Sequence, residues 1–137
     1  MATSIRKVGY YKLRTPNKPG VGALLMKALR EGKVNLLAMT AFPEGKGCQV
    51  DLVPEKAEKL KAVAKQLPAK LSQEKTGFLV QGKDATGALL PILQVLGDAG
   101  IDVTAIDAIS AGKKRFGAIF WVQAKDVAKA AKLLKAK

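Results

Sequence analysis

Apolar and polar positions follow one order of elements twice along the chain. In the first copy, a Tyr- and Leu-rich run ends at Thr15-Pro16, a strand stop, and the next run carries a helical stripe at residues 21, 24, 25, 28 and 29. The pattern predicts a strand over 9–15, a helix over 20–30, strands over 34–42 and 48–53 with a hairpin loop over 43–47 between them, and a second helix that opens at Pro54.

The second half of the chain repeats this order. Its apolar run at 116–122 is nearly unbroken, which is typical of a strand that is covered on both faces. Pro91 falls in the first turns of a helix, where proline costs little. The second copy predicts strands over 78–82, 101–109 and 116–122 and helices over 87–99 and 125–134.

An offset of 67 residues aligns the two copies without a gap. The stretch Asn17-Lys18-Pro19-Gly20 falls on Asp84-Ala85-Thr86-Gly87, and Leu29 falls on Leu96. Identities number only about a dozen, but the glycines and apolar positions keep their spacing, which indicates an internal repeat.

The repeated order is that of the split βαβ, ferredoxin-like arrangement. We therefore predict an α+β protein of two ferredoxin-like βαββαβ units, each an antiparallel sheet with helices on one face, over residues 1–74 and 75–137. Residues 70–73 supply a fourth strand for the first unit, whereas almost nothing follows Leu134 in the second. The second sheet is then expected to have an edge that is open, or filled by the Thr3–Lys7 arm or by a partner subunit.

Composition limits the setting and the chemistry. No apolar run approaches the roughly 20 residues of a membrane span, and no apolar segment of a signal peptide follows the N-terminus. Cys48 is the one cysteine, so we expect no internal disulfide and a reduced, cytoplasmic setting. The chain has no histidine and only one cysteine, which excludes a His-dependent triad and a zinc site.

The formal net charge of +13 first suggests a polyanion partner such as nucleic acid. The 24 basic residues are spread along the chain, and the densest cluster, Lys113-Lys114-Arg115, is short. No run alternates basic with aromatic residues, and aromatic residues make up only 5% of the chain. A solvated basic surface is therefore favoured over a nucleic-acid face, which stays open as an alternative.

The junction of the first strand and helix, Asn-Lys-Pro-Gly-Val, followed later by Gly-Lys-Val-Asn-Leu, resembles the ACT domain. Asp-Ala-Thr-Gly with Gly-Ile-Asp-Val resembles a weaker copy, so nearly the whole chain is similar to a stand-alone tandem ACT protein. The resemblance implies regulation by a small molecule, often an amino acid, held between paired domains. No cofactor or metal is expected. It also implies a homodimer or a protein partner, and ligand contacts at Asn17 and Asn35.

The physical chemistry of the junction agrees with that implication. The first turn of a helix near Gly20 offers backbone N–H groups, and its dipole favours a carboxylate. Gly20 and Gly22 permit close approach to the backbone, and an asparagine can both donate and accept. The residues predicted to contact ligand are Asn17, Lys18, Pro19, Gly20, Val21, Asn35, Asp84, Gly87 and Asp102.

Structural roles remain open for several of these residues. Asn17 could only cap the helix, and Asn35 could be a polar entry to a strand. Lys18 and Lys33 are expected to be solvated, while Cys48 is expected to be an ordinary strand thiol. Trp121 is expected in a core or interface rather than as a stacking platform.

The two copies differ at the predicted site. Asp84 and Asp102 replace Asn17 and Asn35, and two carboxylates there would repel a ligand carboxylate. We predict that the first junction is the better anion site. The leading hypothesis is a non-catalytic amino-acid sensor. The alternative is a nucleic-acid-binding protein on the same scaffold. Nothing in the sequence pairs a nucleophile with a base, so an enzyme is not indicated.

Overall fold

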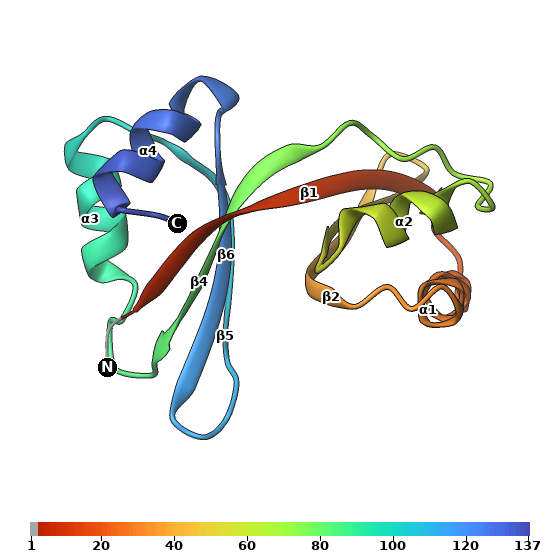
Figure 1. Cartoon of the computed structure of the whole chain (residues 1–137), viewed down its shortest axis with the longest axis horizontal. Coiled ribbons are helices and arrows are strands. Elements are labelled where there is room, and N and C mark those ends of the chain that lie inside the picture. Colours follow the sequence, from red (N-terminus) through yellow and green to blue (C-terminus); the bar gives the residue numbers. More distant parts are fainter. Residues whose placement is uncertain (1–2) are drawn as a thin grey trace. The chain divides into compact units, whose positions relative to one another are not determined.

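The structure, a computed structural model, describes residues 3–137 (Figure 1). Six strands and four α-helices are found in these residues, together with a short 3-10 helix, η1 (Ala124–Asp126). In chain order they are β1 (Ser4–Pro16), α1 (Val21–Glu31), β2 (Leu36–Glu44), β3 (Gly47–Pro54), α2 (Ala57–Ala64), β4 (Lys75–Lys83), α3 (Leu90–Asp98), β5 (Val103–Ser110), β6 (Arg115–Val122) and α4 (Val127–Leu134).

The chain divides into two units, as the repeat predicts, but not at the predicted residues. The first unit is Gly9–Lys75, and the second unit is Thr76–Lys137 together with residues 3–8. The sequence division placed residues 3–8 in the first unit. They belong to the second because the beginning of β1 runs beside β4, and because Lys7 and Ile5 exchange backbone hydrogen bonds of 3.0 and 3.1 Å with Lys137. Of the three possibilities left open for the edge of the second sheet, the structure has the one in which the N-terminal arm fills it.

In the first unit the strands lie in the order β2-β3-β1, antiparallel throughout. Tyr11 and Leu13 of β1 pack with Leu25 and Leu29 of α1 and Leu60 of α2 to form the core. Alternate residues of a strand face opposite sides, so the core lies on the side of the sheet that the helices cover.

The predicted fourth strand of the first unit, residues 70–73, is not a regular strand. It nevertheless lies at the expected edge, because Ser72 N donates to Lys12 O at 2.8 Å and Ser72 Oγ accepts from Lys12 N at 2.8 Å. A side-chain oxygen thus replaces one backbone carbonyl of the ladder, which interrupts the strand geometry.

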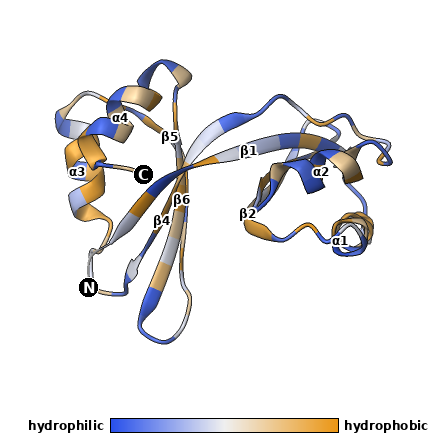
Figure 2. Ribbon diagram, in the orientation of Figure 1, coloured by the Kyte–Doolittle hydropathy of each residue, from blue (hydrophilic) through white to orange (hydrophobic). Residues whose placement is uncertain are grey.

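In the second unit the order is β1-β4-β6-β5, and α3 and α4 lie on one side of the sheet (Figure 1). Phe78 of β4 and Phe120 of β6 stack in its core with ring centroids 5.0 Å apart. Trp121, expected in a core or interface, is only 6% exposed. In Figure 2, α2 and α4 each carry both hydrophobic and hydrophilic residues, as expected for helices with one face on a sheet.

Several element boundaries differ from prediction, and three of them are described below. Pro54 ends β3 instead of opening α2, which begins at Ala57. β2 begins at Leu36 rather than at Val34, because the turn that ends α1 reaches Val34: Lys33 has a positive φ of 58° and Val34 N donates back to Leu29 O. The helix predicted from Gly87 begins only at Leu90. No helix among residues 3–137 is long and apolar enough to cross a membrane.

Candidate ligand-binding site

The candidate site is the junction between β1 and α1 in the first unit. Pro16 ends β1, Val21 begins α1, and residues 17–20 between them are exposed. Gly20 is the N-cap with φ 88°, a left-handed conformation that side chains other than glycine rarely adopt. Glycine at this position is therefore required by the turn itself.

Asn17 does not cap the helix. No side chain makes a cap hydrogen bond at the start of α1, and Asn17 Oδ1 instead accepts a 3.4 Å hydrogen bond from Cys48 Sγ. The contact follows from strand register, since Thr15 lies opposite Cys48 in the β1–β3 pair. With Oδ1 engaged there, the amide nitrogen is the donor that Asn17 can offer to an incoming oxygen.

Among residues 3–137, no side chain covers the backbone in the first turn of α1. Val21 N donates to Lys18 O at 3.3 Å, and the first turn contains no acidic side chain. A Cβ placed on Gly20 or Gly22 would meet no atom within 4 Å other than those of its chain neighbours and of the α1 backbone nearby. Space therefore exists for a small molecule to reach the N–H groups of Gly22 and Ala23, which have no acceptor within a helix.

The corresponding junction of the second unit is built differently. Asp84 N donates to Lys114 O at 2.8 Å, and turn bonds from Ala88 N to Ala85 O and from Leu90 N to Gly87 O precede the helix. Gly87 is exposed with φ 70°, and Pro91 lies in the first turn of α3, where it removes one N–H donor. This junction thus presents fewer free backbone N–H donors than the junction of α1. It also carries the negative charge of Asp84.

Within one unit, the structure does not bring the predicted junction and second-strand residues together. Asn17 follows Pro16, which pairs with Gly47, whereas Asn35 precedes Leu36, which pairs with Pro54. The length of β3, from Gly47 to Pro54, separates the two, and this is about 23 Å.

The second unit has the same separation. Asp84 follows Lys83, opposite Arg115, and Asp102 precedes Val103, opposite Val122. Residues Arg115–Val122 span a similar length of about 23 Å. A molecule of amino-acid size cannot contact both members of either pair within one unit.

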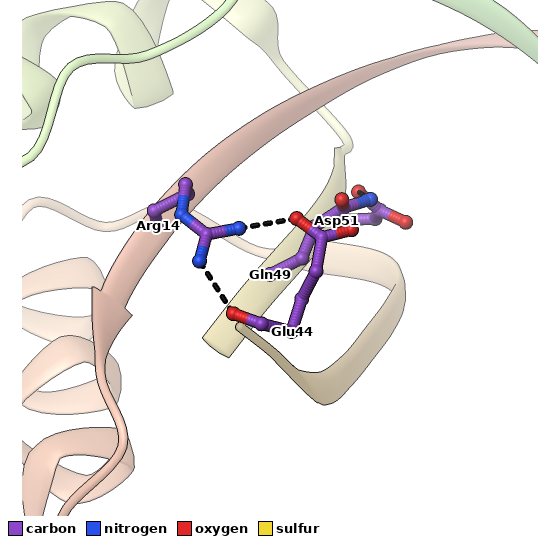
Figure 3. Close-up of polar contacts among 4 residues, drawn as sticks. All are labelled: Arg14, Glu44, Gln49 and Asp51. Atoms are coloured by element: carbon purple, nitrogen blue, oxygen red, sulfur yellow. Dashed lines mark hydrogen bonds and ion pairs between the residues drawn. The ribbon is translucent and has the colours of Figure 1, made fainter. Parts of the chain in front are cut away.

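Sequence analysis missed a polar cluster on β1, β2 and β3 (Figure 3). Arg14 pairs with the Glu44 carboxylate and its Nη2 donates to Glu44 O at 2.6 Å, while Gln49 Nε2 donates to Asp51 Oδ1 at 3.1 Å. Asp51 is only 8% exposed, and burial, followed by the charge of Asp51, raises the pKa of Tyr10. Arg14, Gln49 and Asp51 alternate with apolar residues along their strands, and this sequence pattern could have predicted the cluster.

The remaining predicted residues lie on the surface. Lys18, Pro19, Asn35 and Asp102 are exposed, and Val21 is half-buried. Asn35 contributes its carbonyl to structure, since it accepts from Glu55 N at 2.8 Å. Among residues 3–137, no group of three or more histidine, cysteine, aspartate or glutamate side chains is placed to hold a metal ion.

No protein-family model and no curated protein matches this sequence. The chain is similar to a protein from Bacteroides thetaiotaomicron of known crystal structure, with 14% identity over 96% of this chain and 88% of that chain and a TM-score of 0.82. It is also similar to the regulatory subunit of aspartate kinase from Thermus thermophilus, in its ligand-free form, with 14% identity over 98% of this chain and 96% of that chain and a TM-score of 0.63.

The regulatory subunit of aspartate kinase from Thermus flavus is similar to the same degree, with 15% identity over 98% of this chain and 95% of that chain and a TM-score of 0.62. At such identities the likeness concerns the fold. The chain therefore has an ACT-like fold of two ferredoxin-like units, the arrangement that the sequence predicts.

Proposed function

We propose that this protein is a non-catalytic regulatory module that binds an amino acid at the junction of β1 and α1. The observation that carries the proposal is the open first turn of α1, where Gly20 and Gly22 leave the backbone uncovered and no side chain caps the helix. The N–H groups of that turn would hold the α-carboxylate, with the helix dipole favouring its charge.

Asn17 would contribute the side-chain contact. Its Oδ1 is held by Cys48, so its amide nitrogen donates to the carboxylate or to a polar group beside it. Lys18 and Pro19 would shape the lip, with Lys18 adding positive charge. The fold shared with regulatory subunits of aspartate kinase supports a regulatory role.

Asn35 would contact the ligand from a second copy of the chain. Because Asn17 and Asn35 lie about 23 Å apart along the length of β3 in one unit, a ligand that meets both requires Asn35 from another copy of the chain. We therefore propose a homodimer in which ligand bridges two copies and shifts their docking. Asp84, Gly87 and Asp102 would form a weaker or differently selective site.

A thermal-shift screen against the twenty amino acids at low millimolar concentration tests the proposal. A ligand that binds only the folded state raises the melting temperature by mass action. We expect a selective rise that is lost in Asn17→Ala. No rise with any amino acid would contradict the proposal and leave Asn17–Gly20 as a structural turn.

The net charge of +13 favours a second candidate, a nucleic-acid-binding protein. The chain has 24 basic and 11 acidic side chains, so more than half of the basic side chains have no acidic side chain of the chain to pair with. Electrophoretic mobility shifts with short RNA and DNA at several salt concentrations would test it. Binding that prefers one sequence and persists near 0.15 M salt would support this candidate, because non-specific binding falls steeply with salt.

A further inference from the structure

A cavity of about 500 Å³ lies beside the junction, within the first unit. Pro16 and Val21, the residues that flank Asn17–Gly20 in the chain, both line it. The other lining residues come from the end of β1, the beginning of α1 and the segment after α2: Leu13, Arg14, Thr15, Leu24, Leu25, Leu67, Pro68 and Ala69.

The side chains of this cavity are almost all apolar. Leu13 and Leu25, 2% and 6% exposed, belong to the core and form its floor. Leu24 is 69% exposed, so a large apolar side chain stands uncovered at the wall. A cavity of this size with such a lining has the properties of a small-molecule site, and a patch of exposed apolar surface is commonly an interaction surface.

The charged residues at and near the cavity indicate which charge a bound molecule can carry. No acidic side chain lines the cavity, whereas Arg14, which pairs with Glu44, lines it and Lys70 directly follows the lining residue Ala69 in the chain. An apolar occupant with a negatively charged head matches this distribution, and a cationic side chain does not. The negative end would lie toward the junction, where Val21 begins α1.

We infer that the ligand is an amino acid with a large apolar side chain, such as leucine, isoleucine, methionine or phenylalanine, and that this side chain fills the cavity beside Leu24. The inference rests on the proposed function, since it takes the head group to sit at the open turn of α1. The inference adds which amino-acid side chains the site prefers, which the contacts at the junction alone do not define. The apolar side chain covers Leu24 and displaces water from the apolar lining.

Isothermal titration calorimetry of the full chain with leucine, isoleucine, methionine, phenylalanine, alanine, serine, aspartate and lysine tests the inference. We expect leucine or another large apolar member to bind at least about tenfold more tightly than alanine, as the extra methylene groups enter an apolar pocket. Leu24→Asp should weaken that binding at least about tenfold, because it places a like charge and a hydrated group at the cavity wall.

Leu90→Asp is the matched control. Leu90 is 64% exposed at the first residue of α3, so this change adds the same charge at a similar exposure in the other unit, and it should leave binding at the first junction unchanged. A second variant, Ala69→Phe, fills the cavity from the segment after α2 and should also weaken binding without touching α1.

The outcomes are distinct. Tight binding of a small or charged amino acid that is unaffected by Leu24→Asp and Ala69→Phe would overturn the inference while the proposed function stands. Absence of binding by every amino acid would overturn both. A change of oligomeric state in Leu24→Asp without ligand, measured by sedimentation, would overturn the inference by showing that a second copy of the chain covers Leu24.

Discussion

The hydroxyl of Tyr11 donates a 2.6 Å hydrogen bond to Oε2 of Glu74, from the core of the first unit to its edge. Tyr11 is 1% exposed, and Glu74 lies two residues beyond Ser72, which pairs with Lys12. The bond therefore anchors the edge segment of the first unit to β1, where regular strand pairing is missing.

Tyr11→Phe should destabilise the protein by about 1 kcal/mol, since it removes one hydrogen bond to a carboxylate at an exposed glutamate. Burial, and then the hydrogen bond to Glu74, raise the pKa of Tyr11 to about 12 from 10.0. The folded state thus favours the neutral phenol, so this stabilisation is complete below pH 10 and is lost as the pH rises to about 12. Urea unfolding of both proteins across this range measures the difference, and a difference that grows with pH would contradict this account.

Gly32→Ala should destabilise the first unit by about 1–3 kcal/mol, because overpacking forces neighbours to move. A Cβ at Gly32 would lie 2.1 Å from Cγ2 of Val63, where α1 ends against α2. Gly97→Ala in α3 is the control, since its Cβ would meet nothing within 4 Å, and it should stabilise by about 0.5 kcal/mol. Thermal unfolding measures both, and Val63→Ala combined with Gly32→Ala should recover part of the loss.

Lys7→Pro should loosen the edge of the second unit. The change removes the N–H that donates to Lys137 O at 3.0 Å, and we expect a loss of about 1–3 kcal/mol. Lys7→Ala keeps the N–H and should cost much less. Amide hydrogen exchange provides the measurement: faster exchange at Lys137 and along β4 is expected, and unchanged exchange there would mean that the arm does not complete the sheet.

Asn17→Ala should abolish amino-acid binding, and Asp84→Ala should leave the principal site intact, because the first junction offers the open helix turn. The reverse result would invert the ranking of the two junctions. Both residues are exposed, so neither change should alter stability by more than about 0.5 kcal/mol. Calorimetric titration with the amino acid that emerges from the screen measures the effect.

Gly22→Ala should block the ligand by its methyl group alone. Its Cβ meets no atom within 4 Å outside its chain neighbours and its own helix backbone, and alanine favours a helix, so stability should be kept or rise by about 0.5–1 kcal/mol. Gly97→Ala changes helix stability in the same direction without affecting binding. If Gly22→Ala binds as tightly as the parent protein, the ligand does not approach this backbone.

The sequence predicts the two copies and their element order, because periodicity and the offset of 67 residues are properties of the chain itself. It leaves open what fills the edge of the second sheet. It does not predict where α3 begins. Thr86–Leu89 forms a turn with bonds from Ala88 N and Leu90 N, and this turn competes with the helix that Gly87 and Ala88 could otherwise open. Propensity alone does not decide between two local hydrogen-bond patterns of similar cost.

The candidate site is predicted only in part. Gly20 as a left-handed N-cap follows from the residue type, whereas the bond from Cys48 to Asn17 depends on the register of β1 with β3. The cavity near Leu24 depends on Leu67–Ala69, which lie far from α1 in the sequence. A surface assembled from segments more than 40 residues apart has no local signal in the chain.

Chemical-shift mapping by two-dimensional NMR of the ¹⁵N-labelled protein, titrated with the amino acid that raises its melting temperature, tests the central claim most directly. The account predicts the largest and saturable shifts at the backbone amides of Gly20, Gly22 and Ala23 and at the side-chain amide of Asn17. Saturable shifts centred elsewhere, with these amides unmoved, would contradict it.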